Sequence, residues 1–324
     1  MKPTLSLALA AALALTTLLG VALAAATPAT LPALKSTDIP RDTQSGPAAP
    51  GGGRAQPPVP ANAKLPTLWL IGDSTVRNGT AGDGTNLNQW GWGAPLVAYF
   101  DLTKINVVNR AFGGTSSRSF YGANWKRMVD LIQKGDFVLL QFGANDNGGA
   151  TGKGALPGVG DNTAMNGAET VHSFGWYLQQ YVAETRAKGA TPIICSLTPR
   201  KGWTPDGHFV RANTTHAAWA GQVAKTTQTP YVDLYELIAR SYEVLGPGKV
   251  DALYVPSPTE KLHTGWDGAV NNAECVVAGL KNLQDDPLAP YLSDRGQAVA
   301  AVDTTLPAPP PKPAAPATPS AAHP

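Results

Sequence analysis

The stretch Leu68-Trp69-Leu70-Ile71-Gly72-Asp73-Ser74-Thr75 is an apolar run of strand length that ends abruptly in Gly-Asp-Ser. In an α/β protein, ligands and catalytic groups gather at the carboxyl ends of parallel strands. Gly72 allows a sharp turn there, so the hydroxyl of Ser74 would lie beside free backbone N–H groups. That position suits the nucleophile of an acyl transfer. It also suits a plain helix N-cap after a buried strand, and these residues alone leave both interpretations open.

Both ends of the 324-residue chain have compositions typical of segments outside a folded domain. Residues 1–24 combine one lysine, an apolar Leu/Ala core and a final Ala22-Leu23-Ala24, which is the pattern of a secretory signal peptide. A retained membrane helix is the alternative. Residues 25–64 and 298–324 are rich in Pro, Ala and Gly, so we expect a disordered linker and a disordered tail around one domain at 65–297.

Charge and cysteine content exclude several classes of partner. The formal net charge is +2, and without a basic run we expect no nucleic acid partner. After the signal segment no apolar run reaches about 18 residues, so we expect a soluble, secreted or periplasmic monomer without a membrane partner. Cys195 and Cys275 are too few for a metal site, and we expect no metal or cofactor. The two thiols either pair or stay buried and free.

Strand-like and helix-like segments alternate along the central region, which favours a three-layer α/β/α domain with a five-stranded parallel sheet. The expected strands are 69–71, 105–109, 137–142, 192–197 and 231–234. The expected helices are 95–100, 125–132, 169–188, 213–226, 235–245 and 266–283, with a loose insertion at 147–167. Right-handed crossovers place all strand ends on one rim. That rim would collect Ser74, Gly114, Asn145 and the loop after Leu197.

An esterase-like serine needs a base, and the chain offers five histidines. His323 lies in the tail, while His172 and His216 fall in expected helices, where solvent exposure is the simplest expectation. His263 lies in the loop 259–264, before the last helix, and Glu260 precedes it by three residues. The carboxylate could accept from the imidazole Nδ1–H and leave Nε2 for Ser74. An incidental Glu and His on a surface loop is the alternative.

Two rim residues could stabilise an oxyanion. Gly114 can offer a backbone N–H where no side chain crowds a substrate, and Asn145 can offer its side-chain amide. Taken singly, Gly114 is also consistent with an ordinary turn and Asn145 with an Asx turn at a strand end. Their order along the chain, together with Ser74 and His263, favours the catalytic interpretation.

These residues resemble the four sequence blocks of the GDSL or SGNH hydrolases. The blocks are Gly72-Asp73-Ser74, Gly114, Gly143-Ala144-Asn145-Asp146 and Glu260-Lys261-Leu262-His263. Within that superfamily the chain is most similar to the rhamnogalacturonan acetylesterases. That closer similarity rests on Gly91-Trp92-Gly93, Asn109, Ser116-Ser117-Arg118-Ser119-Phe120, Lys134-Gly135-Asp136-Phe137-Val138, His263-Thr264 and Gly268-Ala269.

The resemblance implies a flavodoxin-like SGNH fold with Ser74 as nucleophile, His263 as base and Glu260 as its partner. It also implies an oxyanion hole made by the N–H groups of Ser74 and Gly114 and the amide of Asn145. Two positions depart from the family pattern. Glu260 stands where Asp is usual, which leaves the triad intact, and Ala144 stands where His is frequent, which changes the lining of the pocket.

The implied substrate is an acetylated polysaccharide, most simply rhamnogalacturonan or another pectin. Aromatic and basic residues near the rim could stack on sugar rings and pair with uronate carboxylates, and ordinary packing is the alternative for each. These candidates are Trp92, Tyr121, Arg200, Trp203, His208 and Trp266. Acetyl-xylan, other acyl esters and a non-catalytic role as an exported carbohydrate-binding protein are the alternative functions.

Overall fold

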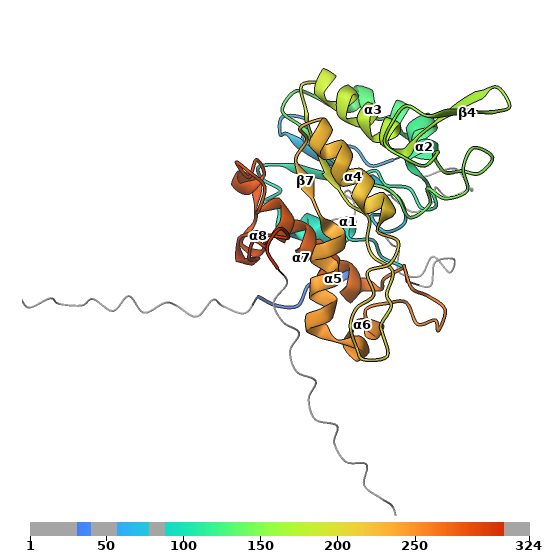
Figure 1. Ribbon diagram of the computed structural model, residues 1–324. Coiled ribbons are helices and arrows are strands. Elements are labelled where there is room, and N and C mark those ends of the chain that lie inside the picture. The colour runs from blue at the N-terminus through green and yellow to red at the C-terminus, as the bar shows by residue number, and fades with distance from the viewer. Residues whose placement is uncertain (1–30, 40–56, 78–87, 308–324) are drawn as a thin grey trace, which may run out of the picture. The chain divides into compact units, whose positions relative to one another are not determined.

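The computed structural model describes residues 31–39, 57–77 and 88–307 (Figure 1). Every helix and strand among them belongs to one unit, which begins at Pro32. The expected signal peptide at 1–24 lies outside the described residues.

The predicted five-stranded parallel sheet is confirmed. Its strands follow the order β2-β1-β3-β6-β7, so β1 lies between β2 and β3. Their bounds are β1 Thr67–Gly72, β2 Asn106–Asn109, β3 Phe137–Gln141, β6 Thr191–Cys195 and β7 Tyr231–Val232. All residues of β1, β2 and β3 are buried, because helices cover both faces of the sheet. This explains why the strands read as continuous apolar runs without alternation.

Successive side chains of β1 point into two different hydrophobic cores. Leu68 and Leu70 pack with residues of α5 (Leu234–Leu245) and α7 (Trp266–Leu280). Trp69 and Ile71 pack on the opposite face with residues of α3 (Phe174–Ala187) and α4 (Thr215–Thr226). The two-residue period of a strand therefore generates the three layers that Figure 1 shows.

Shorter helical segments complete the described part of the chain. They are η1 Ser36–Asp38, α1 Gly93–Leu96, η3 Val97–Tyr99, α2 Ser117–Phe120, η4 Tyr121–Trp125, η5 Val129–Leu131, α6 Pro247–Ala252, η6 Ala289–Tyr291 and α8 Asp294–Ala298. The single helix predicted at 125–132 is not formed: η4 ends at Trp125 and η5 covers only Val129–Leu131. Within the described ranges, no helix has the length and apolarity needed to cross a membrane.

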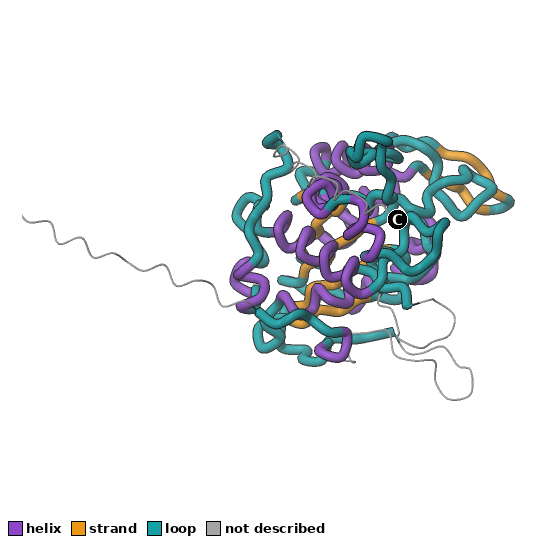
Figure 2. The backbone as a smooth tube through the Cα atoms, turned by 90° about the horizontal axis from the view of Figure 1, so that it is seen from below, coloured by secondary structure: helices purple, strands orange, loops and turns teal. Residues whose placement is uncertain are grey.

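A small hairpin replaces the first turn of the helix expected at 169–188. Strand β4 (Thr163–Asn166) pairs antiparallel with β5 (Glu169–His172), and the pair projects from the helices (Figure 2). Gly167 and Ala168 form the two-residue turn between the strands, and Gly167 has φ +61°, a left-handed conformation that suits glycine at the first turn position. Helix α3 then starts after Ser173, whose hydroxyl accepts from the backbone N–H of Trp176.

The expected linker and tail both contact the domain where they are described. Ile39 is buried, and the indole N–H of Trp266 donates to the carbonyl oxygen of Leu34 at 2.7 Å. At the other end, Arg240 on α5 donates to the main-chain oxygens of Asp303 and Thr304. Short described segments beyond the predicted bounds at 65 and 297 therefore pack on the domain.

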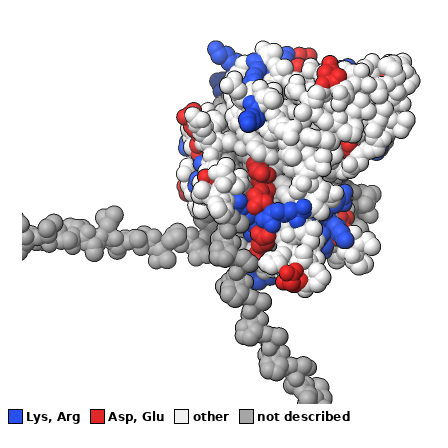
Figure 3. All heavy atoms as spheres, in the orientation of Figure 1, with Lys and Arg blue, Asp and Glu red and all other residues white. Residues whose placement is uncertain are grey.

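Charged side chains of both signs mix on the surface over α5 (Figure 3). Arg211 forms ion pairs with Glu236 and Glu243, and Arg240 pairs with Glu236 one helical turn away. The ion pairs of Arg211 hold the segment that precedes α4 against α5. Such half-exposed networks contribute modestly to stability.

The two cysteines are free thiols in separate places. Cys195 ends β6 and Cys275 lies on α7, and both are buried. Burial raises the pKa of both thiols, so neither is a thiolate at neutral pH. The disulfide that the sequence left open is not formed.

Candidate active site

Ser74 lies in a tight turn directly after β1. The backbone N–H groups of Val76 and Arg77 both donate to the carbonyl oxygen of Asp73, which closes the turn. Gly72 is required before it, because a Cβ there would lie 2.6 Å from the carbonyl oxygen of Gln141. The chain therefore leaves the sheet with Ser74 half-buried at the carboxyl end of the strand.

Ser74, His263 and Glu260 form a continuous hydrogen-bonded chain. The Ser74 Oγ lies 3.0 Å from His263 Nε2, and His263 Nδ1 lies 3.0 Å from Glu260 Oε2. The carboxylate can only accept at Nδ1, so that nitrogen carries the proton of the neutral ring and Nε2 is left to accept from the serine. The arrangement matches the roles of nucleophile, base and orienting acid.

Hydrogen bonds from its own loop keep the Glu260 carboxylate ionised. Burial on its own would raise the pKa of Glu260, but hydrogen bonds from the main-chain N–H groups of His263 and Leu262, and from the imidazole, lower it to about 2. The two N–H···Oε1 distances are 2.9 Å for His263 and 2.7 Å for Leu262. A negative charge therefore faces the imidazole throughout the neutral pH range.

The loop that carries the base is anchored from two sides. The hydroxyl of Thr264 donates to the carbonyl oxygen of Trp90 at 2.8 Å. The backbone N–H of Lys201 donates to the carbonyl oxygen of Lys261 at 2.8 Å, which joins the loop after β6 to the His263 loop. These contacts fix the base relative to the sheet although it is remote from Ser74 in sequence.

The turn that carries the expected donor Gly114 lies beside Ser74. A Cβ on Gly113 would lie 3.9 Å from the Ser74 Cβ, so the Gly113-Gly114 turn is adjacent to the nucleophile. Gly114 has φ +74°, and no described atom lies within 4 Å of where its Cβ would stand. Within the described ranges, the backbone N–H groups of Ser74 and Gly114 have no hydrogen-bond partner. Both are available to an oxygen that becomes negatively charged.

Asn145 is tied to the same turn. Its side-chain Nδ2 donates one hydrogen bond to the carbonyl oxygen of Thr115 at 3.0 Å. An amide NH₂ carries two hydrogens, so a second donor remains. The next residue, Asp146, accepts from the Ser117 hydroxyl at 2.6 Å and from its backbone N–H at 3.1 Å. The end of β3 therefore holds the 114–117 turn at two successive residues.

Two buried acids lie beside the triad without belonging to it. Burial raises the pKa of Asp146, against the hydrogen bonds from Ser117. Burial also raises the pKa of Asp73 to about 6, although Thr75 donates to it from both its backbone N–H and its hydroxyl. The other oxygen of Asp73, Oδ2, has no hydrogen-bond partner among the described atoms. Asp73 is thus an acid kept in the turn at an energetic cost.

The structure separates the expected substrate-binding residues into different places. Trp92 is fully buried and its indole N–H donates to Gln141 Oε1 at 2.7 Å, so it cannot contact a sugar and that expectation is wrong. Tyr121 binds Glu184 through its hydroxyl, within a cluster of aromatic rings from α3. Trp203 packs partly buried on Phe209, and Trp266 packs edge-on against Trp90. His208 is exposed beside Asp206.

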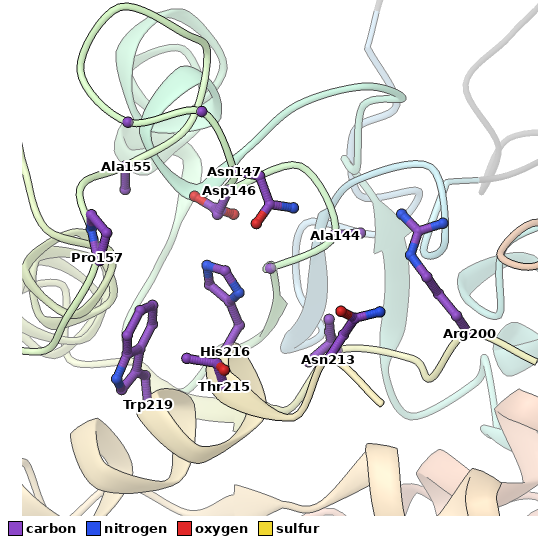
Figure 4. A pocket seen from close by; sticks show the side chains of 14 residues that line it. Ala144, Asp146, Asn147, Ala155, Pro157, Arg200, Asn213, Thr215, His216 and Trp219 are labelled. Atoms are coloured by element: carbon purple, nitrogen blue, oxygen red, sulfur yellow. The ribbon is translucent and has the colours of Figure 1, made fainter. Parts of the chain in front are cut away.

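Among the six expected substrate-binding residues, Arg200 lines a cavity (Figure 4). The cavity has a volume of about 300 Å³ and lies between the loops that follow β3 and β6 and the start of α4. Side chains labelled in Figure 4 that line it include Ala144, Asp146, Asn147, Asn213, His216 and Trp219. His216 is half-buried at this cavity, so the simple expectation of solvent exposure is corrected.

Nothing in the sequence pattern singled out Asn213, His216 or Trp219 as residues of one site. They surround the start of α4, where helical spacing alone does not show which side chains face a rim. One usable signal was the asparagine at the start of the predicted helix 213–226: Asn213 adopts φ +59°, a left-handed conformation that asparagine tolerates, and α4 begins two residues later.

Comparison with known proteins places this geometry in a family. The sequence profile of the GDSL-like lipase/acylhydrolase family matches residues 70–268, which is more than half of the chain. A rhamnogalacturonan acetylesterase of Emericella nidulans is 32% identical over 227 residues, covering 68% of this chain and 86% of the relative. The probable rhamnogalacturonan acetylesterase YesY of Bacillus subtilis is 30% identical over 219 residues, covering 67% and 93% of the two chains.

A solved structure has the same fold. The crystal structure of the Bacillus subtilis protein YXIM superimposes with a TM-score of 0.55 at 26% identity. The match covers 67% of this chain and 56% of that one. With the five-stranded parallel sheet and the family profile across the Ser74 turn and the His263 loop, the chain belongs to the GDSL-like lipase/acylhydrolase family.

Proposed function

We propose that the protein is a secreted serine esterase that removes O-acetyl groups from a plant cell-wall polysaccharide, rhamnogalacturonan or a related pectin. The single observation that carries the proposal is the chain from Ser74 Oγ through both nitrogens of His263 to Glu260, with 3.0 Å at each step. This chain supplies the nucleophile, the base and the charge that an ester hydrolysis needs.

The proposed reaction has two halves. His263 Nε2 takes the proton of Ser74 while Oγ attacks the acetyl carbonyl carbon, and the imidazolium returns that proton to the departing sugar oxygen. The acetyl group is then bonded to Ser74. Water repeats the sequence: His263 removes its proton, its oxygen attacks the acetyl carbon, and the serine oxygen leaves with the proton from His263. Acetate is released and the resting enzyme is restored.

Glu260 and the oxyanion donors act on charge that appears only during reaction. The carboxylate of Glu260 stabilises the imidazolium and keeps its ring in place, and its low pKa supports that role. The backbone N–H groups of Ser74 and Gly114 and the second hydrogen of Asn145 Nδ2 are the proposed donors to the tetrahedral oxyanion. Such preorganised donors are often the largest contribution to rate.

The relatives support a carbohydrate ester as substrate. Both curated proteins described above are named as rhamnogalacturonan acetylesterases, and each aligns with about two thirds of this chain. The Gly114 turn beside Ser74 is exposed, and no described atom lies within 4 Å of where a Cβ would stand, which is consistent with an ester carried on a large polymer. Export is supported by the composition of residues 1–24.

The proposal is tested by acetate release from a panel of substrates. Acetylated rhamnogalacturonan, acetylated homogalacturonan, acetyl-xylan and long-chain nitrophenyl esters are compared with the wild-type protein and Ser74→Ala. We expect release to be fastest from the pectic substrates and absent in Ser74→Ala. Preference for acetyl-xylan or for long acyl chains would replace the substrate class. Binding without release by the wild-type protein would show a non-catalytic carbohydrate-binding protein.

A further inference from the structure

The cavity of about 300 Å³ lies on the same rim as the triad. Its β3 side is formed by Gly143, Ala144 and Asp146–Gly149, which flank Asn145, and its β6 side by Leu197 and Arg200. Strand β1, which carries Ser74, is hydrogen-bonded to β3, and β3 to β6. Since neighbouring strands are roughly 5 Å apart, the loops that line the cavity leave the sheet close to the strand that precedes Ser74.

One end of the cavity is lined by polar side chains that have no hydrogen-bond or ion-pair partner in the described part of the protein. Arg200, Asn147 and Asn213 are exposed, and within the described ranges their side chains have no hydrogen bond or ion pair. Arg200 is nevertheless well placed, because the next residue, Lys201, is bonded through its backbone to the His263 loop. In Figure 4 the guanidinium stands at one end of the cavity with Asn213 beside it. An unused guanidinium on an anchored loop suits a carboxylate.

The other end of the cavity is aromatic. Trp219 and Pro157 lie there, and His216 stands between them and Asn213 (Figure 4). The His216 ring is fixed edge-on against Trp219 and Phe174, with centroids 4.9 and 5.0 Å apart. Burial lowers the pKa of His216, so this ring is neutral at neutral pH. A flat aromatic wall next to hydrogen-bonding groups is suited to a sugar ring.

Charge in the cavity favours an anion at the Arg200 end. Arg200 is the one Lys or Arg among the 14 lining residues, and Asp146 is the one acid. The Asp146 carboxylate is buried and accepts from the Ser117 backbone N–H and hydroxyl. These hydrogen bonds compensate the charge of Asp146. The Arg200 guanidinium, in contrast, is available to bind an anionic ligand.

We propose that this cavity is a subsite for an acidic sugar, a uronate residue next to the acetylated one in the same chain. Arg200 pairs with the uronate carboxylate, Asn213 binds a ring hydroxyl, and Trp219 packs against the following ring. Ala144 keeps the passage between the subsite and Asn145 open, because a larger side chain there would narrow it. The inference rests on the proposed function, and it assigns the residues that select an acidic polymer.

The decisive experiment compares one oligosaccharide in two forms. Acetylated uronate-containing oligosaccharide is prepared with free carboxylates and as its methyl ester, and 4-nitrophenyl acetate serves as an ester too small to reach the cavity. Arg200→Gln should lower kcat/KM for the free-carboxylate form roughly 10- to 100-fold, mainly through KM, as expected for one charge-assisted hydrogen bond. It should leave 4-nitrophenyl acetate unchanged.

The methyl ester provides the internal check. Methylation removes the charge from the substrate, so it should slow the wild-type protein by a similar factor and leave Arg200→Gln nearly unaffected. Arg127→Gln is the matched control, because Arg127 is exposed and does not line the cavity. Asn213→Gly keeps the left-handed backbone while removing the amide, and should raise KM for both oligosaccharides several-fold.

The outcomes separate this inference from the proposed function. Equal losses for Arg200→Gln and Arg127→Gln, or an equal loss on the free and methylated substrates, would overturn the subsite while acetate release continued. No acetate release from any acetylated saccharide would overturn the proposed function instead. In that case, uronate binding by Ser74→Ala, measured by calorimetry with and without Arg200→Gln, still decides the subsite.

Discussion

Glu260 binds His263 at two places: Oε2 lies 3.0 Å from the imidazole Nδ1, and Oε1 lies 2.9 Å from the backbone nitrogen of the same residue. One carboxylate thus fixes the ring relative to its own main chain. The two residues are three positions apart, and the extra methylene of glutamate lets the side chain fold back onto the loop. The glutamate that stands here in place of the usual aspartate therefore contacts both the ring and the main chain of His263.

This double contact predicts the effects of two substitutions. Glu260→Gln keeps an acceptor but removes the charge that stabilises the imidazolium, so kcat should fall roughly 10²- to 10⁴-fold, less than for loss of His263. Glu260→Asp should also be slow, because the shorter side chain cannot reach both groups. Steady-state kinetics on an acetylated substrate measures both. Asp267→Asn is the control, and a fully active Glu260→Gln with an inactive Asp267→Asn would make Asp267 the partner of the base.

A serine mechanism predicts a steeper loss at the other two members. Ser74→Ala and His263→Ala should each lower kcat by several orders of magnitude, and the double variant should be hardly worse than either, because the residues act as one unit. A serine-reactive phosphonate should label Ser74, as mass spectrometry of the peptide would show. Chelators should leave the rate unchanged. Labelling at another serine, or substantial activity in Ser74→Ala, would contradict the assignment.

The positions of Ser74 and Asn145 at the ends of strands could be predicted, because the end of an apolar run is visible in the local sequence. The apolar run before Gly72 and the strand before Asn145 identified where polar residues leave the sheet, and parallel topology then brought them together. Trp92 was misjudged because an expected position near the rim does not show whether a side chain is exposed. Its indole instead meets Gln141 inside the domain, a contact between residues 49 positions apart. Local pattern does not reveal such tertiary partners.

The cavity residues were harder to predict for the same reason. Asn213, His216 and Trp219 face the rim only because α4 packs beside α3 and the loop after β3 closes over its start. The β4–β5 hairpin was missed because it spans the boundary between the predicted insertion at 147–167 and the predicted helix at 169–188. Long-range packing, rather than propensity, decided these features.

Asp73 predicts a specific dependence of stability on pH. Its pKa is raised by burial from 3.8 to about 6, so its folded state binds the proton more tightly than the unfolded state does. The stability this confers is fully present below pH 3.8 and is lost as the pH rises to about 6, by roughly 3 kcal/mol.

Asp73→Asn should remove that dependence, because its amide oxygen can still accept from Thr75. Denaturant unfolding of the two proteins at pH 4 and pH 7 measures the difference. The stability of wild type relative to Asp73→Asn should fall between the two pH values. A constant difference would show that Asp73 titrates at its ordinary pKa.

Substitution of Asn145 tests whether its side-chain amide donates a hydrogen bond to the oxyanion. One hydrogen of its amide is donated to Thr115 O, with the nitrogen 3.0 Å from that oxygen, which leaves the other hydrogen for the oxyanion. That donor gains strength only when the substrate oxygen becomes negative, so its loss should appear in kcat more than in KM. We expect Asn145→Ala to lower kcat about 10²- to 10³-fold. Asn145→Asp should be at least as slow, since it sets a carboxylate against the oxyanion and against Thr115 O.

The bond to Thr115 makes Asn145 structural as well, so the prediction needs a control that loosens the same turn without touching the oxyanion. Ser117→Ala does this, because it removes the hydroxyl that donates to Asp146 at 2.6 Å and leaves the backbone N–H in place. Both alanine variants lose one hydrogen bond, about 1 kcal/mol, and should melt a few degrees lower. Only Asn145→Ala should lose kcat by the larger factor. Matching losses of kcat in the two variants would mean that Asn145 acts through the position of the turn and that the hole has backbone donors alone.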